Sequence, residues 1–192
     1  MRIGILLFND VEELDFVGPL EVFGIASKLV ESLAVTTVSK DGRSIRARYG
    51  LQVQPDHGFD SCPALDLLIV PGGRGARLGA AKDKETIAFV KAHAATKPVA
   101  SVCTGAIVLA EAGLLNGKKA TTHHTAIEML RQYPEVTVVE GARFVLGERV
   151  ATSAGISAGI DLSLEFVRNH FGEKVARDVA EEMEYDLPAS DA

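Results

Sequence analysis

The sequence has no tryptophan, only two cysteines and few aromatic residues, which make up 6% of its 192 residues. Cys62 and Cys103 are too few for a disulfide framework, so a thiol is available for chemistry or for packing. No apolar run approaches the roughly 18 residues of a membrane-spanning helix. The apolar run at residues 3–8 leads directly into acidic residues rather than a cleavage site. We therefore expect a cytoplasmic protein with no membrane partner.

Basic residues are also in the minority. The chain has 20 Lys and Arg against 26 Asp and Glu, and its formal net charge is −6. Nucleic-acid binding requires a concentrated basic surface, whereas these basic residues are dispersed, so we expect no nucleic-acid partner. What the sequence does contain is 47% hydrophobic residues. Residues 1–192 are thus predicted to form one globular domain with a sizeable core.

Short apolar segments alternate with segments of helical periodicity along the chain. This alternation predicts an α/β fold, a doubly wound three-layer sandwich with a mostly parallel sheet and with ligands bound at the carboxyl ends of the strands. A hairpin-like arm is expected at residues 43–53. Strands are expected at residues 2–8, 33–39, 65–70, 98–102, 119–122, 136–139, 144–146 and 150–152. Helices are expected over about ten residues from Gly18-Pro19, and at residues 84–95, 104–112, 125–132, 160–171 and 173–185.

Cys103 stands where a predicted buried strand passes directly into a helix. The small residues Ser101 and Gly105 flank it closely. This layout is typical of a nucleophile elbow, a sharp turn that holds its central residue in strained backbone. The dipole of the following helix favours the thiolate, so we predict a nucleophile with a lowered pKa, whereas Cys62 should titrate normally. The alternative is that Cys103 is a buried packing residue.

A glycine-rich turn at residues 71–75 follows the neighbouring strand. Gly72 and Gly73 would allow backbone N–H groups to turn toward a reacting atom, and with the Thr104 amide they would form an oxyanion-hole-like pair. Taken alone, such a turn is more typical of a tight connection, and it is not a phosphate-binding fingerprint.

Asp15 is expected in the turn after the first strand, between Leu14 and Phe16. Apolar neighbours raise the pKa of a carboxyl group, which suits Asp15 to exchange a proton with a thiolate. The alternative is an acidic residue at the entry to a helix, shortly before Pro19.

Five ordered segments of the sequence resemble the ThiJ/PfpI superfamily, and together they cover nearly the whole chain. They are residues 15–23, 70–73, 101–106, 120–123 and 152–161. The resemblance implies a flavodoxin-like, class I glutamine amidotransferase-like α/β/α sandwich that usually forms homodimers. Within the superfamily the pattern is most similar to isocyanide hydratases and to the ligand-sensing domains fused to AraC-type transcription regulators.

The resemblance also implies roles for individual residues. Cys103 would be the nucleophile and Asp15 its carboxylate partner, surrounded by Gly72, Gly73 and Thr104. Asp15 stands where many members carry glutamate, which matches the hydratase branch and departs from the glyoxalase and deglycase branches. Thr104 stands where PfpI-like proteases carry histidine, which puts a protease-like Cys-His arrangement in doubt.

Two adjacent histidines, His123 and His124, follow the strand expected at residues 119–122. A cysteine nucleophile often works with an imidazole, and adjacent side chains cannot both enter one pocket, so one of them should face Cys103. His123 matches a histidine of the hydratase-like pattern. No nearby Cys or Glu completes metal-ligand spacing, so we expect no metal.

Three functions remain open at this point. The first is hydration of an isocyanide to an N-substituted formamide, with Cys103 attacking the terminal carbon and Asp15 moving a proton. The second is cofactor-free glyoxalase III or deglycase activity on α-oxoaldehydes through a hemithioacetal on the same cysteine. The third is a sensor in which Cys103 is oxidised or a small ligand binds. Both enzyme readings require a small-molecule substrate and no cofactor.

Overall fold

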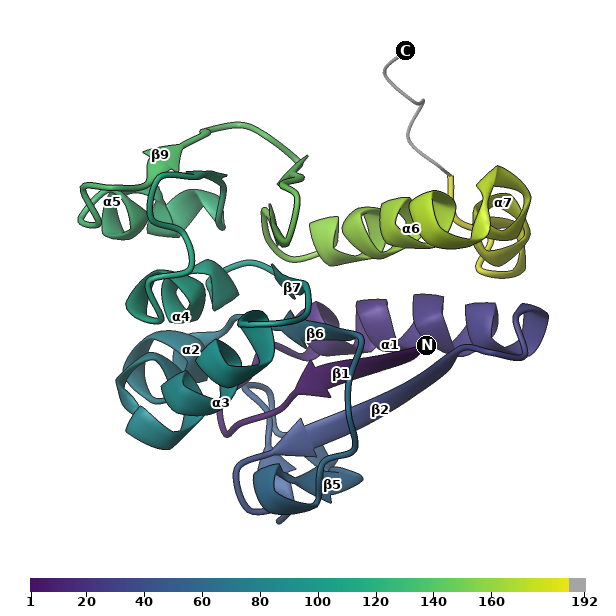
Figure 1. Cartoon of the computed structure of the whole chain (residues 1–192), viewed down its shortest axis with the longest axis horizontal. Helices are drawn as coiled ribbons and strands as arrows, with labels where there is room; N and C mark the ends of the chain where they lie inside the picture. Colours follow the sequence, from purple (N-terminus) through teal and green to yellow (C-terminus); the bar gives the residue numbers. More distant parts are fainter. Residues whose placement is uncertain (187–192) are drawn as a thin grey trace.

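A seven-stranded sheet forms the centre of the computed structural model, which describes residues 1–186 (Figure 1). Its strands are β1 (Arg2–Leu6), β2 (Ala34–Ser39), β5 (His57–Gly58), β6 (Leu67–Val70), β7 (Val99–Ser101), β10 (Phe144–Val145) and β11 (Val150–Ser153). They lie in the order β10-β11-β7-β6-β1-β2-β5. All neighbours are parallel except the antiparallel pair of β10 and β11. The predicted α/β sandwich with a mostly parallel sheet is confirmed.

Helices cover both faces of this sheet (Figure 1). One layer consists of α1 (Glu13–Leu29), α6 (Ala158–Phe171) and α7 (Glu173–Glu182), which pack against one another. The other face carries α2 (Arg74–Leu78), α3 (Lys84–Ala94), α4 (Gly105–Glu111) and the short α5 (Ile127–Leu130). Single 3₁₀ turns lie at Phe59–Ser61, Ala80–Lys82 and His124–Ala126. Each layer closes its own hydrophobic core on one side of the sheet.

The first helix differs from its prediction. It begins at Glu13 rather than near Gly18 and contains 17 residues, so Asp15 lies in its first turn and Pro19 inside it. Proline normally disfavours a helix interior because it lacks an N–H group. Here tertiary packing outweighs that cost, since Phe16 and Phe23 are buried against the sheet and α6. Local turn signals were therefore misleading at this position.

The segment around residue 120 is a second correction. The strand predicted at residues 119–122 does not continue the central sheet. Within residues 1–186, β8 (Lys119–Ala120) pairs with β9 (Thr137–Val138) alone, as a separate parallel ribbon. The arm at residues 43–53 forms as expected, with β3 (Ile45–Arg46) antiparallel to β4 (Gln52–Val53). The glycine-rich turn is shorter than predicted because α2 already begins at Arg74.

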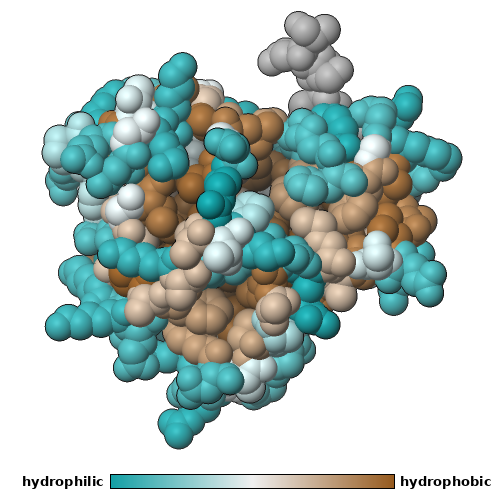
Figure 2. Space-filling model, in the orientation of Figure 1, coloured by the Kyte–Doolittle hydropathy of each residue, from teal (hydrophilic) through white to brown (hydrophobic). Residues whose placement is uncertain are grey.

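The surface is mixed rather than uniformly polar. Figure 2 shows hydrophobic residues gathered in the middle of one face, with hydrophilic residues around its periphery. The large hydrophobic side chains with substantial exposure are Leu14, Leu29, Tyr49, Leu51, Leu78 and Leu146. Among residues 1–186, no helix is both long and apolar enough to cross a bilayer.

Candidate active site

Cys103 occupies the junction between β7 and α4, at the carboxyl edge of the sheet. Its backbone has a φ of +57°, a left-handed conformation that costs free energy for a residue with a side chain. Hydrogen bonds hold it there: the Cys103 N–H group is shared between the carbonyl oxygens of Ser153 and Ala154, each at 3.2 Å. Thr122 Oγ1 donates to the Cys103 carbonyl oxygen at 2.8 Å. The structure thus has the strained strand-to-helix turn that the sequence predicts.

Close approach explains the small residues around this turn. A Cβ atom on Gly105 would lie 2.0 Å from the Val70 carbonyl oxygen, so only glycine lets α4 start so near β6. On the other side, a Cβ atom on Gly155 would lie 2.9 Å from Cys103 Sγ. Gly155 thus lies directly against the thiol, and Cys103 is only 5% exposed.

Asp15 reaches the same place from the first turn of α1 and is fully buried. Its Oδ2 accepts a hydrogen bond from the Gly72 N–H group at 2.9 Å. Its Oδ1 is buried and has no partner in hydrogen-bond geometry among residues 1–186, although the Cys103 thiol is close enough to affect its ionisation. Burial raises the Asp15 pKa from 3.8 to about 7 against the lowering effect of the Gly72 N–H group. Burial is therefore the cause of the raised Asp15 pKa that the sequence predicts.

The pKa of the Cys103 thiol differs from the sequence-based prediction. Burial, and next the negative charge of Asp15, raise the pKa of Cys103, while the Thr104 N–H group acts in the opposite direction. The expected lowering of the Cys103 pKa is wrong because desolvation and the Asp15 charge outweigh any effect of the following helix. Burial raises the pKa of Cys62 as well, so that thiol does not titrate normally either.

The glycine-rich turn supports the site but does not form the predicted oxyanion-hole-like pair. The Gly72 N–H group is used by Asp15, and the Gly73 N–H group donates to Thr104 Oγ1 at 2.9 Å. Thr104 Oγ1 in turn donates to the Gly73 carbonyl oxygen at 3.1 Å. These bonds fix the turn against the elbow, and a Cβ atom on Gly72 would meet Asp15 Oδ2 at 2.8 Å. Gly72, Gly73 and Thr104 thus position the thiol and the carboxyl.

Of the two histidines, His123 faces the site and His124 does not. A Cβ atom on Gly155 would lie 2.2 Å from His123 Cδ2 and close to Cys103 Sγ, so imidazole and thiol border the same glycine. His123 Nδ1 lies 2.8 Å from Thr125 Oγ1 and accepts from the Thr125 N–H group at 3.2 Å, which leaves Nε2 for other partners. Burial lowers the His123 pKa, so its ring is neutral at neutral pH. His124 is exposed.

An ion pair beside the site was not anticipated. Glu12 is 4% exposed, and its Oε2 accepts from Arg48 Nη1 at 2.8 Å. The charges of both residues act on Asp15: Glu12 raises its pKa and Arg48 lowers it. Glu12 belongs to an acidic run that the sequence presents as an ordinary turn. Arg48 lies in the β3–β4 arm, where the periodicity of the sequence does not indicate a contact partner. Only the tertiary structure shows that Glu12 and Arg48 meet.

The arm is tied firmly to the loop that leads into α1. The Arg48 N–H group donates to the Val11 carbonyl oxygen at 2.9 Å, and the Asp10 N–H group donates to the Arg46 carbonyl oxygen at 2.8 Å. The Tyr49 N–H group donates to Glu13 Oε1 at 2.6 Å. These contacts hold the charge of Arg48 near Asp15. Among the described residues, no three His, Cys, Asp or Glu side chains are arranged to bind a metal ion.

A doubly wound α/β sandwich with a cysteine at a strained elbow and a buried carboxyl group beside it defines a recognisable class of proteins. The profile of the DJ-1/PfpI family matches residues 1–169. The chain belongs to the DJ-1/PfpI family, which confirms the resemblance found in the sequence.

Two relatives and one solved structure are similar to this chain along nearly its whole length. Isonitrile hydratase of Pseudomonas putida is 38% identical over 186 residues, which are 96% of this chain and 78% of that protein. HTH-type transcriptional regulator GbdR of Pseudomonas aeruginosa is 30% identical over 96% of this chain, which spans only 50% of the regulator. A crystal structure of a ThiJ/PfpI family protein from Pseudomonas syringae superposes with a TM-score of 0.88 at 32% identity, covering 100% of this chain and 78% of that one. The family thus includes both an enzyme and a regulator similar to this chain.

Proposed function

We propose that this protein is a cysteine-dependent hydro-lyase that adds water to an isocyanide to give an N-substituted formamide. Cys103 is the nucleophile and Asp15 the proton carrier. Gly72, Gly73 and Thr104 hold these two groups in place, and His123 borders the substrate.

The reaction balances without a cofactor. Cys103 sulfur bonds to the terminal carbon of R–N≡C while the thiol proton passes to Asp15 Oδ1. Asp15 then returns that proton to the same carbon, which gives the thioimidate R–N=CH–S–Cys103. Water adds to this carbon and supplies a proton to nitrogen, and the C–S bond breaks to release R–NH–CHO. The remaining hydroxyl proton returns to sulfur through Asp15.

The observation that carries this proposal is the pairing of Cys103 with a buried carboxyl group whose pKa is raised to about 7. A group with a pKa near neutral pH can both accept and donate a proton during turnover. The unpartnered Oδ1 of Asp15 is the acceptor that a buried thiol needs, because the thiol itself is not ionised at neutral pH. The similarity to an isonitrile hydratase, another name for isocyanide hydratase, supports the choice of substrate class.

A panel of substrates tests the proposal directly. The purified protein is assayed with an alkyl isocyanide, with methylglyoxal and with a peptide, beside Cys103→Ala and the matched control Cys62→Ala. We expect formamide from the isocyanide, complete loss in Cys103→Ala and full activity in Cys62→Ala. Turnover of methylglyoxal alone would instead support glyoxalase or deglycase activity, and formamide production by Cys103→Ala would overturn the role of the cysteine.

A ligand or redox sensor is the second candidate, supported by similarity to the regulator GbdR along nearly the whole chain. Peroxide titration separates the two, with isocyanide hydration and light scattering recorded on the same sample. An enzyme loses turnover in step with oxidation of Cys103. A sensor shows no turnover at the start, and its oligomeric state changes as Cys103 is oxidised.

We also propose the oligomeric state and the cellular compartment in which the protein acts. Residues 1–192 work as one domain, and two copies form a homodimer, for which the apolar side chains exposed on the surface provide contact area. Both cysteines are free. Free thiols, one of them catalytic, suit a reducing compartment such as the cytoplasm. Sedimentation equilibrium of the purified chain tests the dimer.

A further inference from the structure

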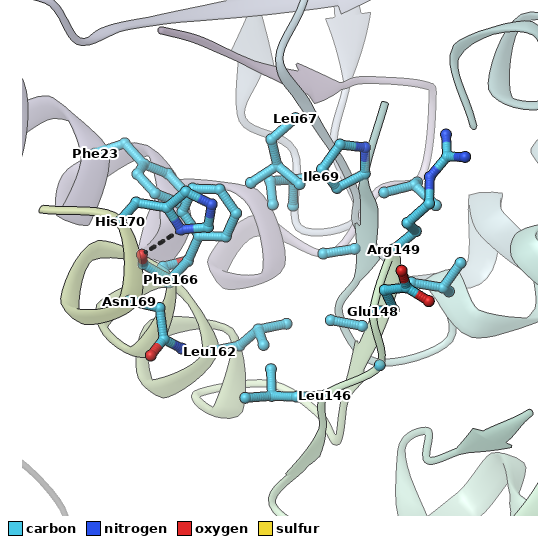
Figure 3. A pocket seen from close by; sticks show the side chains of 17 residues that line it. Phe23, Leu67, Ile69, Leu146, Glu148, Arg149, Leu162, Phe166, Asn169 and His170 are labelled. Atoms are coloured by element: carbon cyan, nitrogen blue, oxygen red, sulfur yellow. Dashed lines mark hydrogen bonds between the residues drawn. The ribbon is translucent and has the colours of Figure 1, made fainter. Parts of the chain in front are cut away.

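A cavity of about 170 Å³ lies between α6 and the central sheet, beside the start of β7 (Figure 3). Its lining includes Pro98, Val99 and Ala100 at the start of β7, and residues 147–151 at the start of β11. Cys103 follows the other end of β7. The cavity is therefore at the amino edge of the sheet, whereas the candidate active site is at the carboxyl edge.

The cavity has a simple origin in the sequence. Strand register places Ile5, Ile69, Ala100 and Ala151 side by side across four neighbouring strands. All four side chains belong to the core on the α6 side of the sheet. A buried parallel strand usually carries Val, Ile or Leu at such positions. Two adjacent alanines instead leave unfilled volume beneath α6.

The inner side of this cavity is apolar and buried. Phe23, Leu67 and Ile69 are at most 2% exposed and form its floor. The Phe23 and Phe166 rings meet edge to face with centroids 5.9 Å apart. In Figure 3, Leu162 and Leu146 complete the apolar surroundings from α6 and from the segment before β11.

Polar and charged side chains stand around the mouth of this cavity. Glu148 is exposed and makes no hydrogen bond or ion pair within residues 1–186, whereas four others are engaged. Ser163, Arg149, Asn169 and His170 each have a protein oxygen as partner. The partners are Gly159 O for Ser163 Oγ (2.7 Å), Ala94 O for Arg149 Nη2 (3.0 Å), Glu165 Oε1 for Asn169 Nδ2 (3.0 Å) and Phe166 O for His170 Nδ1 (3.0 Å). A ligand seated against the buried apolar side would therefore be held mainly by contact with carbon atoms.

We propose that this cavity is a binding site for a small, neutral, apolar molecule about the size of one aromatic ring. An apolar cavity of about 150 Å³ in a protein core stays dry and binds benzene, because water finds no hydrogen-bond partners there. The present cavity has a similar volume and a largely apolar lining, but it opens to the surface beside the exposed Leu146, Glu148 and Arg149, so its inner apolar part is the binding surface. This inner part offers no partner to a charged group, so a neutral ligand fits it best.

The site is independent of the proposed hydration chemistry because Cys103 and Asp15 take no part in it. Binding to Cys103→Ala should equal binding to the wild type. Loss of the hydratase proposal would thus leave this inference standing, and the reverse also holds.

Methyl-labelled NMR with toluene as the probe tests the site. Toluene should give saturable shifts at the methyl groups of Leu67, Ile69 and Leu162, and it should raise the melting temperature of the wild type. Ala151→Leu fills the cavity, so these shifts should be lost while the variant itself becomes more stable. The matched control Ala34→Leu adds the same side chain at the exposed start of β2 and should leave the shifts unchanged.

A second variant covers the case in which Ala151→Leu does not fold. Leu162→Ala enlarges the cavity and should accept a larger probe such as naphthalene, which the wild type excludes. Absence of saturable shifts in the wild type would overturn the proposal. Toluene shifts that persist in folded Ala151→Leu would overturn it too, because binding would then occur elsewhere.

Discussion

Arg48 Nη1 lies 2.8 Å from Oε2 of Glu12, a buried carboxylate three residues before Asp15. The pair joins the β3–β4 arm to the start of α1. Because Glu12 raises the pKa of Asp15 and Arg48 lowers it, the arm contributes to the charge balance at the candidate proton carrier.

Removal of Arg48 should shift the pH dependence of turnover. In Arg48→Ala the negative charge of Glu12 is no longer compensated, so the Asp15 pKa rises and the acid limb of kcat/KM moves to higher pH. Arg48→Lys should restore much of the wild-type profile. Arg43→Ala removes the same charge from an exposed position of the same arm and serves as the control. An acid limb that stays in place in Arg48→Ala would contradict this electrostatic role.

Asp15→Asn should remove most turnover while keeping the fold. The amide oxygen still accepts from the Gly72 N–H group, but it cannot carry the thiol proton. We expect roughly a hundredfold loss of kcat or more, the usual size of general acid–base effects. In the wild type, activity should rise with pH through about 7, where Asp15 ionises. Kinetics with the best isocyanide across this range provide the measurement, and unchanged kcat in the variant would exclude Asp15 as proton carrier.

Asp15→Asn should increase the stability of the fold at high pH, although it reduces turnover. The folded-state pKa of Asp15 is about 7 against an ordinary 3.8, so its stability contribution is present at low pH and lost as pH rises through 7. Asp15→Asn avoids this loss, and its advantage at pH above 7 has an upper limit of about 4 kcal/mol. Urea unfolding at both ends of this pH range measures it. A variant with no advantage at high pH would show that Asp15 is not destabilised by burial.

Alkylation of Cys103 should become faster in Asp15→Asn even though turnover falls. The Asp15 charge is a major cause of the raised thiol pKa after burial, so removing it lowers the pKa and increases the thiolate fraction. Iodoacetamide rates against pH, followed by mass spectrometry, would show the Cys103 profile move to lower pH. Cys62 lies outside the site and provides an internal control whose profile should not move. Identical Cys103 profiles in both proteins would contradict the coupling.

Gly155→Ala should damage the site through a single methyl group. Its Cβ would lie 2.2 Å from His123 Cδ2 and 2.9 Å from Cys103 Sγ, so at least one of these groups must shift. We expect roughly a tenfold or greater loss of kcat/KM, since small misplacements of reacting groups are costly. Gly24→Ala is the matched control, because a Cβ atom there meets nothing within 4 Å. Equal activity of the two variants would show that the neighbourhood of Gly155 is not critical.

The sequence by itself determined the α/β sandwich and the position of Cys103 at a strand-to-helix turn. Buried parallel strands are continuous apolar runs, and helices have a 3.6-residue period. The local sequence pattern is therefore sufficient to predict both kinds of element. Cys103 was recognisable because an elbow requires small residues on both sides within a few positions. Asp15 was recognisable as a carboxyl among apolar neighbours, although its helical position was not.

Tertiary structure decided the rest, because the missing information lies in contacts between distant segments. Pro19 falls inside α1 since packing of Phe16 and Phe23 outweighs a local breaker. The thiol pKa rises because burial and the Asp15 charge depend on how α1 meets the elbow. The pairing of Glu12 with Arg48 spans 36 positions of the chain. Ionisation in the site is thus set by desolvation and by charges from separate elements, which no local pattern records.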